Sequence, residues 1–370
     1  MRVKLGDICE IVSRSTPKTN IEEYWDGDIK WITPAELNDE TYIITDSVRK
    51  ITELGVKKTG LTPFPKGTVI LSSRAPIGKV AIAGCEMYCN QGFKNLICSE
   101  KIDNRYLYWF LKGNTEFLQS LGRGATFKEI SKTIVANIEI NIPDKSVQTQ
   151  IVDNLEKTSQ IIRLRKQELS KLEELVRARF VELFGDENNS KNWSIVHIED
   201  VADVQVGVVI KPSQYYTDES NGIKAFRSLN VGAGFIKDSD WVYFTAEGHQ
   251  KNSKSILREN DLLIVRSGAP GTACVVTEDY VGCNAIDIII AHPNCEKVNP
   301  YYLCTFTNMP HGKKQIVEGT GGAAQQHFNV GKYNKLQLML PPKELQDKFV
   351  EFINQIAKSK FTKTFSLLRC

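Results

Sequence analysis

The sequence predicts an α+β fold in which two β-rich domains are joined by long α-helices packed as an antiparallel coiled-coil spacer. Three observations support this fold class: an internal repeat, short β-type runs bounded by Gly and Pro turns in both halves, and a long segment free of Gly and Pro that carries a heptad pattern. The chain has 370 residues, which is the length expected of about two domains that each bury their own core.

The internal repeat is visible in a short phrase that occurs twice, as LSSRAPIGKVAI in the first half and VRSGAPGTACVV in the second. Three pairs of segments match in the same order: Ala75-Pro76 with Ala269-Pro270, Cys89-Asn90 with Cys283-Asn284, and Gln148 with Gln346. The first two pairs lie 194 positions apart and the third lies 198 apart. Small insertions in loops account for the change of spacing, so we interpret the chain as two diverged copies of one domain-plus-helix unit.

Both predicted domains alternate β-type runs with turns. We expect strands at 68–71, 79–83 and 137–140 in the first half, and at 261–266 and 273–276 in the second. One helical stretch is expected near 106–121. The domain boundaries that follow are 1–142 for the first domain, 143–186 for the first spacer helix, 187–341 for the second domain and 342–370 for a second spacer helix.

The first spacer helix contains no Pro or Gly from 144 to 184. Its apolar residues recur every seven positions, at Leu155, Ile162, Leu169, Val176 and Leu183, a pattern typical of packing against another helix. The second helix offers Phe349, Ile353 and Ile356 as the partner surface. An ordinary long surface helix is the alternative.

The second helix is shorter than the first, because only 29 residues follow Pro341. We therefore expect part of the first helix, near Val176, Phe180 and Leu183, to have no partner within the chain. Exposed apolar stripes usually mark a protein interface. The isolated chain is expected to self-associate, or to be unstable, until another subunit covers this seam.

Composition excludes several classes of protein. No apolar run approaches the roughly 20 residues needed to cross a bilayer, and Met1–Asp7 lacks the apolar stretch of a signal peptide, so we expect a cytoplasmic protein with no membrane partner. Nine scattered cysteines indicate free thiols. Cys85 and Cys89 lack the second ligand pair that a zinc site needs, and neither a metal site nor an assembled catalytic site is expected.

The order LGDICEIVSRSTPKTN, WDGDIKWITPAELN, GTVILSSRAPIGKVAI, YCNQGF, GRGATFKEI and INIPDKSVQTQIVDNLEK resembles the specificity subunit of type I restriction-modification enzymes (the HsdS family). The second half repeats the scheme. The resemblance implies that each β-rich domain is a target recognition domain for one part of a split site in double-stranded DNA. It also implies that the helices set the separation of the two domains and serve as a platform for methyltransferase (M) and restriction/translocase (R) subunits.

Membership of such a complex implies that this chain is not an enzyme by itself. It would be the non-catalytic subunit of a type I site-specific deoxyribonuclease and adenine-DNA methyltransferase. S-adenosylmethionine, ATP and Mg²⁺ would be used by the partner subunits, and this chain would bind none of them.

Loops that combine cations, amides and hydroxyls with glycine are the candidates for DNA contact, because phosphates are bound by Lys, Arg, hydroxyls and backbone N–H groups while Arg, Asn and Gln read base edges. In the first domain the candidates are Arg14, Ser15, Thr16, Lys18, Ser73, Arg74, Asn90, Gln91, Lys94, Arg123 and Thr126. In the second domain they are Lys211, Arg227, Asn230, Arg266, Ser267, Asn284, Thr320, Gln325 and Gln326. Any one of these residues is equally well explained as part of a solvated turn. The recurrence of such loops in both halves favours DNA.

Other functions remain open at this point. An enzyme acting alone is disfavoured, because the sequence has no P-loop and Gly232-Ala233-Gly234 lacks the third glycine of a dinucleotide-binding loop. The formal net charge of +3 also permits a coiled-coil interaction scaffold that does not bind DNA, or a specificity module of another restriction-modification or phage-defence system. The sequence does not determine the DNA target, the base that each loop reads, or the stoichiometry. The divergence of the two halves does imply an asymmetric site.

Overall fold

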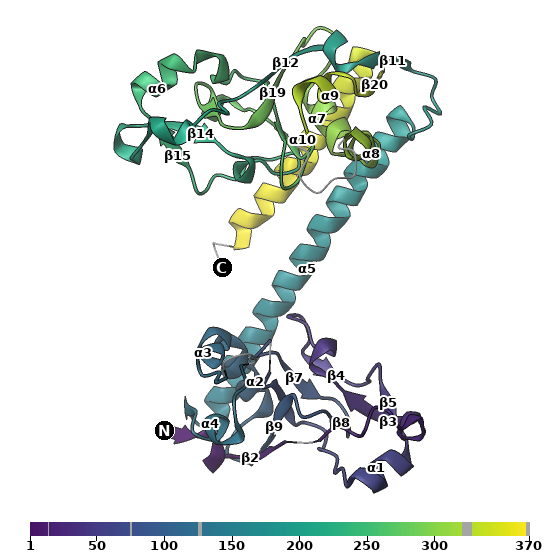
Figure 1. The fold of residues 1–370 in the computed structure, drawn as a ribbon, viewed down its shortest axis with the longest axis vertical. Coiled ribbons are helices and arrows are strands. Elements are labelled where there is room, and N and C mark those ends of the chain that lie inside the picture. The colour runs from purple at the N-terminus through teal and green to yellow at the C-terminus, as the bar shows by residue number, and fades with distance from the viewer. Residues whose placement is uncertain (14, 75, 125–127, 320–327, 368–370) are drawn as a thin grey trace. The chain divides into compact units, whose positions relative to one another are not determined.

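The computed structural model describes residues 1–13, 15–74, 76–124, 128–319 and 328–367. It consists of two compact units, Met1–Arg165 and Lys166–Cys370, and each of them combines small sheets with short helices (Figure 1). Helix α5 (Lys145–Phe184) belongs to both units, because its first half packs in the first unit and its second half in the second.

The main sheet of the first unit has five strands in the order β2-β9-β6-β7-β4. The strands are β2 (Cys9–Val12), β4 (Ile43–Ile44), β6 (Val69–Ser72), β7 (Val80–Ala83) and β9 (Phe93–Cys98). Neighbouring strands pair antiparallel, except that β4 pairs parallel with β7. All residues of β6 and β7 are buried, which explains their nearly continuous apolar runs.

Both faces of this sheet are covered. Val69 and Leu71 pack with helices α2 (Asn104–Gly113), α3 (Thr115–Ser120) and α4 (Lys132–Ala136), while Ile70 packs with residues of a second sheet on the opposite face. The second sheet has the order β5-β3-β8, with β3 (Trp25–Ile32), β5 (Lys50–Ile51) and β8 (Tyr88–Cys89). Helix α1 (Glu53–Thr59) and the antiparallel pair β1 (Arg2–Lys4) and β10 (Glu139–Asn141) complete the unit.

The second unit repeats this arrangement. Its main sheet has the order β12-β19-β16-β17, with β12 (Ala202–Val206), β16 (Leu262–Val265), β17 (Ala273–Val275) and β19 (Ile288–Pro293). Its second sheet has the order β13-β15-β14-β18, with β13 (Tyr216–Thr217), β14 (Ile223–Phe226), β15 (Val242–Phe244) and β18 (Asn284–Ala285). The remaining elements are β11 (Ser194–His197), β20 (Gln337–Leu340), α6 (Ala246–Lys251), α7 (Pro300–Asn308), α8 (Pro310–Gly319), α9 (Val330–Asn334) and α10 (Lys343–Leu367).

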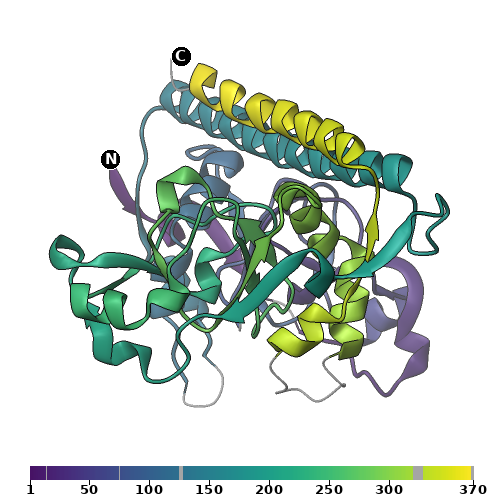
Figure 2. The same cartoon turned by 90° about the horizontal axis from the view of Figure 1, so that it is seen from above.

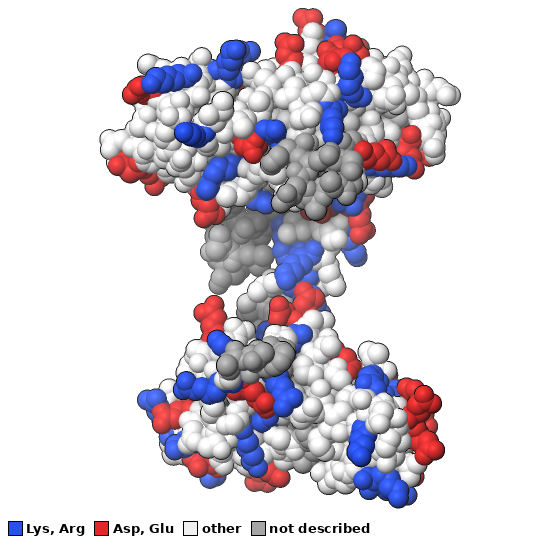
Figure 3. Space-filling view, in the orientation of Figure 1, with Lys and Arg blue, Asp and Glu red and all other residues white. Residues whose placement is uncertain are grey.

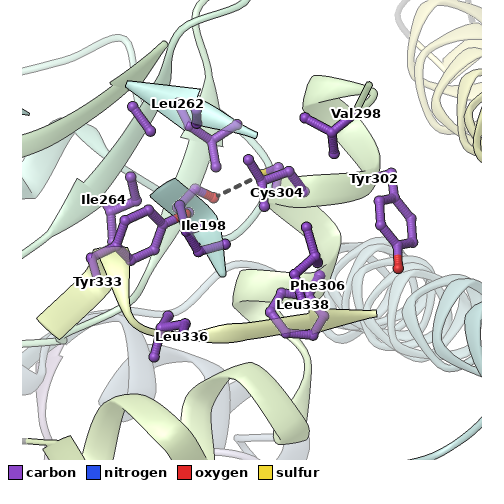
Figure 4. Close-up of a cluster of buried hydrophobic side chains, with 14 of the residues drawn as sticks. Ile198, Leu262, Ile264, Val298, Tyr302, Cys304, Phe306, Tyr333, Leu336 and Leu338 are labelled. Atoms are coloured by element: carbon purple, nitrogen blue, oxygen red, sulfur yellow. Dashed lines mark hydrogen bonds between the residues drawn. The ribbon is translucent and has the colours of Figure 1, made fainter. Parts of the chain in front are cut away.

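The largest core of the second unit lies between its main sheet and its helices. Leu262 and Ile264 of β16 belong to the same buried cluster as Tyr302 and Phe306 of α7 (Figure 4). The Sγ of Cys304 donates to the carbonyl of Ala273 in β17, and the side chain of Asn308 donates to the same carbonyl at 2.8 Å and accepts from the Ala273 N–H at 3.2 Å. Both of these polar side chains of α7 are therefore bonded to the sheet. The eight cysteines that the structure describes are thiols rather than disulfides, as the sequence predicts.

The strand pairs confirm the internal duplication and correct its register. Val69 pairs with Ile82 in the first unit and Leu262 pairs with Val275 in the second, so β6 and β7 correspond to β16 and β17 at a spacing of 193 positions. The turn between these strands therefore also corresponds at 193. Pro76 thus corresponds to Ala269, and not to Pro270, with which the sequence match at 194 paired it.

The register shifts again at the next match. Trp31 faces Tyr88 in the first unit and Ala225 faces Asn284 in the second, so β8 corresponds to β18 at a spacing of 196 positions. The sequence match of Cys89-Asn90 with Cys283-Asn284 is therefore wrong by two positions. In the backbone, Asn284 takes the place of Tyr88.

Two buried glutamines repeat the same set of hydrogen bonds. The Oε1 of Gln148 accepts from the Asp103 N–H at 2.8 Å, and its Nε2 donates to the carbonyls of Lys101 and Pro143 at 3.1 and 2.9 Å. The corresponding bonds of Gln346 are with Asn299 at 2.8 Å, Lys297 at 3.3 Å and Pro341 at 2.8 Å. Both side chains are almost fully buried. Each glutamine thus fastens the first turn of a long helix to the loop before α2 or α7, which is the physical reason for the sequence match between them.

The helical stretch expected at 106–121 is two helices rather than one. Helix α2 ends at Gly113 and α3 begins at Thr115. Asn114, between them, has φ −114° and ψ 27° and donates its side-chain amide to the carbonyl of Phe110 at 2.7 Å. This local bond ends the first helix, and apolar periodicity alone does not reveal it.

The two long helices pack antiparallel within the second unit, which confirms the predicted helix pair. Phe349 near the start of α10 contacts Phe180 and Phe184 near the end of α5, with ring centroids 5.5 and 5.3 Å apart. One turn further along α10, the Phe352 ring lies 5.8 Å from the guanidinium of Arg179. Figure 2 shows α10 beside the part of α5 that belongs to this unit.

The predicted unpaired part of the first helix is at the wrong end. Phe180 is 3% exposed, and Val176 and Leu183 pack half-buried against the core of the second unit. Because the helices are antiparallel, the start of α10 covers the end of α5. In the first half of α5 the exposed apolar side chains are Val147, Leu155, Ile161, Ile162 and Leu164. The other residues predicted to pack between the helices are at least partly buried. Ile356 of α10 is buried, and Ile353 of α10 and Leu169 of α5 are half-buried.

Candidate DNA interface

In the first unit, the candidate loops meet at one edge of the main sheet. Strands β2 and β6 both run antiparallel to β9, so their carboxyl ends lie beside the start of β9. The loop that carries Ser15, Thr16 and Lys18 follows β2, the loop with Ser73 and Arg74 follows β6, and Asn90 and Gln91 directly precede β9. Strand topology therefore brings together three loops that are far apart in the sequence.

Hydrogen bonds join these loops to one another. The Thr16 hydroxyl donates to the side-chain oxygen of Gln91, and the Ser73 N–H donates to the carbonyl of Gly92 at 2.7 Å. Asn90 accepts from the Gly92 N–H at 2.9 Å, which closes a local turn. The sheet edge is thus a connected surface rather than a set of independent loops.

Glu129 lies at the centre of this surface. Its carboxylate accepts from Arg74 Nε at 2.9 Å and from Lys94 Nζ at 3.0 Å. Its backbone pairs in both directions with Arg123, at 3.0 and 2.9 Å, and the Ile130 N–H donates to the carbonyl of Ser73 at 2.9 Å. A fourth loop, which contains Arg123, is thereby tied to the first three.

The charge of Glu129 is stabilised by its partners. Burial raises the pKa of this carboxyl, but hydrogen bonds from Lys94 and Arg74, together with their positive charges, outweigh burial and hold the pKa below its usual value of 4.5. Glu129 therefore orients Arg74, whose side chain is 46% exposed, with its guanidinium at the rim of the surface.

The structure separates the candidates of the first unit into exposed and buried residues. Ser15, Lys18, Arg74, Gln91 and Arg123 are exposed, while Thr16 and Asn90 are half-buried. Ser73 and Lys94 are buried, and the Lys94 ammonium is bonded to Ser73 Oγ at 3.2 Å as well as to Glu129. The structure does not support direct DNA contact by these two residues, because their polar groups are occupied inside the domain. Arg14 and Thr126 lie outside the described residues.

We expect Glu129→Gln to lower the stability of the first unit and to increase its binding to non-specific DNA. The substitution leaves the buried Lys94 ammonium without a charged partner, a loss we place at about 1–3 kcal/mol after allowing for the partial exposure of Glu129, and it releases Arg74. Thermal unfolding and binding to scrambled duplexes measure the two effects. Because the pKa is depressed in the folded state, the contribution of Glu129 is present above pH 4.5 and is lost as the pH falls below that value. A variant whose stability and pH profile match those of the parent would contradict this role.

The second unit presents the same sheet edge with different side chains. The loop after β12 carries Lys211, and Lys211 corresponds to Lys18 because their carbonyls accept from the equivalent N–H groups of Gln214 and Ile21. Lys211 is exposed and has φ 44°, a left-handed conformation that costs a non-glycine residue about 1–2 kcal/mol. A strained, exposed cation at a loop tip is a candidate for ligand contact.

Arg266 begins the loop after β16 and is tied to the interior. Its guanidinium pairs with Asp287, and its Nε donates to the carbonyl of Phe328 at 3.2 Å. Only 15% of its side chain is exposed, so Arg266 positions this loop, while the neighbouring Ser267 is half-buried at the surface.

The structure does not support direct DNA contact by two predicted residues of the second unit. Asn230 and Asn284 are fully buried. The Asn230 side chain accepts from the Arg227 N–H at 2.9 Å and donates to the Ser239 carbonyl at 2.7 Å. Asn284 pairs with His249 Nδ1 and with Ser255 Oγ, both at 2.8 Å. Both amides are occupied by hydrogen bonds that hold loops together inside the domain.

The remaining candidates of the second unit have mixed outcomes. Arg227 is half-buried and donates to the carbonyl of Asp240. Thr320, Gln325 and Gln326 lie outside the described residues.

Sequence reasoning missed Glu129 and Asp287, the two carboxylates that organise the cations, because only Lys, Arg, amides and hydroxyls were taken as candidates. A lone acidic residue in a basic loop, as in GRGATFKEI, is the signal that would have found Glu129.

Charge is mixed over both units. Figure 3 shows Lys and Arg interspersed with Asp and Glu, without a large single-sign patch on the face in view. Among the described residues, no three His, Cys, Asp or Glu side chains are grouped so as to hold a metal ion. No helix in the described part of the chain is long and apolar enough to cross a membrane. The candidate interface is therefore defined by local loop chemistry rather than by overall charge.

These features define a class of protein in which one domain-plus-helix unit is duplicated and each copy presents a set of polar loops at one edge of its sheet. Comparison with known families assigns the chain within that class. The family model described as the type I restriction modification DNA specificity domain matches residues 1–174 and again residues 190–364. The chain belongs to this family, and it carries two copies of the domain.

Individual relatives support the same assignment. The chain is 28% identical over 376 residues to the type I restriction enzyme MjaIX specificity subunit of Methanocaldococcus jannaschii, covering 95% of this chain and 85% of the relative. It is 26% identical to the type I restriction enzyme EcoprrI specificity subunit of Escherichia coli, over 42% of this chain and 41% of the relative.

Among solved structures, the S subunit of a type I restriction-modification system from M. genitalium has a TM-score of 0.57 at 14% identity, covering 100% of this chain and 92% of that one. This likeness concerns the fold. It agrees with the family assignment, because two copies of the specificity domain span most of both the chain and its fold.

Proposed function

We propose that this chain reads a bipartite, asymmetric site in double-stranded DNA, with one element read by each unit. The observation that supports this proposal is the pair of loop sets at equivalent sheet edges, Glu129-centred in the first unit and Asp287-centred in the second. The same backbone carries different side chains at the two edges, so two unlike elements would be recognised.

In this proposal the chain is non-catalytic. Helices α5 and α10 would fix the separation of the two readers and hold the methyltransferase and restriction subunits, for which the exposed apolar residues in the first half of α5 are a suitable surface. S-adenosylmethionine would serve methylation, and ATP with Mg²⁺ would serve translocation and cleavage, all bound by those partners. The complex would act in the cytoplasm.

Exposed arginines at the first sheet edge give a direct test. Arg74→Ala and Arg123→Ala are expected to weaken DNA binding. The loss should be about 1–3 kcal/mol and specific for one position of the site if the arginine reads a base, and it should be equal for all sequences if the arginine contacts a phosphate. Binding isotherms on specific and scrambled duplexes measure the difference.

A control and a salt series complete the experiment. Lys57→Ala is the matched control, because Lys57 lies on α1, outside the four loops, and is 78% exposed with a single exposed partner. Affinity should fall steeply with salt, since cations that neutralise phosphates release counterions. Salt-independent binding, or equal behaviour of all three variants, would favour an interaction scaffold that does not read DNA.

A further inference from the structure

A turn of the second unit carries an exposed aromatic ring. Val231 and Ile236 form a bridge across it, the Gly232 N–H donates to the Phe235 carbonyl at 2.9 Å, and the Gly234 N–H donates to the Ala273 carbonyl at 2.8 Å. Gly234 has φ 82°, which glycine adopts without strain. The turn is therefore fixed to β17, while Phe235 remains 58% exposed.

The ring of Phe235 lies directly over Gly232. A Cβ at position 232 would lie 2.6–2.8 Å from three ring atoms, so only glycine permits this close approach. More than half of the Phe235 side chain is exposed to water, so this ring is not part of a hydrophobic core. One face of the ring nevertheless rests against the backbone of Gly232.

Phe235 forms one wall of an open cavity of about 420 Å³. Leu229, itself 42% exposed, forms another part of the wall. The polar side chains that line the cavity are those of Ser228, Lys237, Ser267 and Thr272. Ser267 belongs to the loop after β16, so the cavity opens beside one of the loops at the candidate DNA interface.

The corresponding turn of the first unit is polar, whereas the turn that carries Phe235 is apolar. The short helices Pro34–Glu36 and Ser228–Asn230 are equivalent, because each has a capping box that joins its third residue to the residue before it. The next turn of the first unit reads Asn38-Asp39-Glu40-Thr41, and Asn38 bonds to the Glu40 N–H at 2.9 Å and to the Thr41 hydroxyl at 3.0 Å. The fold therefore does not require apolar residues at this turn, and the apolar side chain of Phe235 is a feature of the second unit's sequence.

Thymine is the base whose edge matches such a cavity. In the major groove every base edge presents hydrogen-bond donors or acceptors, and thymine also presents a 5-methyl group that apolar side chains contact. We propose that this cavity recognises the 5-methyl group of a thymine in the element read by the second unit, with Phe235 and Leu229 as the contacting residues. Lys237 and Ser267 line the same cavity and suit the flanking phosphate and polar base atoms. This inference rests on the proposed DNA-reading function.

The test compares thymine with deoxyuridine, which pairs identically but lacks the 5-methyl group. The recognised site is first obtained by mapping methylated adenines in cells that carry the assembled complex. Each thymine of the second unit's element is then replaced singly by deoxyuridine, and binding of the complex is measured. One position should bind about fourfold more weakly, as expected for about 0.8 kcal/mol per buried methyl(ene) group.

The protein variant assigns that effect to the cavity. In Phe235→Ala, thymine and deoxyuridine at the sensitive position should bind equally, whereas Val281→Ala, at an apolar residue that is 51% exposed and does not line the cavity, should keep the difference. The inference is overturned if the element contains no thymine, if no position is sensitive, or if Phe235→Ala retains the sensitivity. A complex that binds and methylates no specific DNA would instead overturn the proposed function itself.

Discussion

Phe349→Ala is expected to lower the free energy of unfolding of the second unit by about 3–5 kcal/mol, the usual cost of deleting a buried aromatic side chain. Phe349 is fully buried and contacts both Phe180 and Phe184 of α5. These two rings also contact Tyr302 of α7, at centroid distances of 5.6 and 4.7 Å. The substitution therefore opens a cavity where α5, α7 and α10 meet, and we expect α10 to separate from α5.

Chemical unfolding followed by circular dichroism measures this effect, and hydrogen exchange of α5 and α10 shows where it occurs. Phe117→Ala is the matched control, because Phe117 is 48% exposed on α3 of the first unit, and it should cost less than about 1 kcal/mol. The two units need not unfold together. In Phe349→Ala we therefore expect the second unit to unfold at a lower denaturant concentration, while the transition of the first unit is unchanged. Equal losses in the two variants would show that the aromatic cluster does not hold the helix pair.

Exchange of the first domain for that of another family member is expected to change one half of the methylated motif and leave the other half unaltered. Each unit has its own core and its own loop set at the sheet edge, so specificity should follow the exchanged unit. Single-molecule mapping of methylated adenines reads both halves at once. A change in both halves would contradict the model of two independent readers.

The junction of such an exchange needs care, because contacts of the first unit extend into α5. Exchange of residues 1–142 keeps β1 with its partner β10 but separates Gln148 from the loop that it fastens, and Glu156 from Tyr42 and Arg105. A second chimera that exchanges residues 1–160 retains those contacts. If only the longer chimera is stable, the helix start is part of the domain. If both are stable and equally specific, these contacts are dispensable.

Much of the architecture was predictable because it depends on local sequence. Strand β6 contains an apolar run of three residues and β16 is an apolar run of four, while α5 coincides with a segment that lacks helix breakers. The register between the halves was less predictable. The Ala-Pro dipeptides match at a spacing of 194 positions in the sequence, whereas the paired strands correspond at a spacing of 193 positions. Hydrogen bonds between the strands fix the structural register, and the sequence of the turn between them can shift by one residue.

The candidate site was predictable in its location and only partly in its residues. Lys18 and Lys211 are exposed at equivalent loop tips, as flexible basic loops suggest. The burial of Lys94 and Asn230 was not predictable, since it depends on Glu129 in a loop 35 residues away and on the carbonyls of Lys237 and Ser239. The sequence shows that a side chain is polar but not whether its polar atoms are already bonded within the protein.

The sequence by itself determined that this protein is a duplicated α+β chain with two long helices, because a repeat and a heptad are periodic properties of the chain. Only the tertiary structure decided which part of α5 is covered and which side chains remain at the sheet edges. Antiparallel packing places the start of α10 against the end of α5, so Phe180 is buried while Leu155 and Ile162 are exposed. Direction and burial arise from contacts between distant segments, and the local pattern of the sequence is the same whichever end is covered.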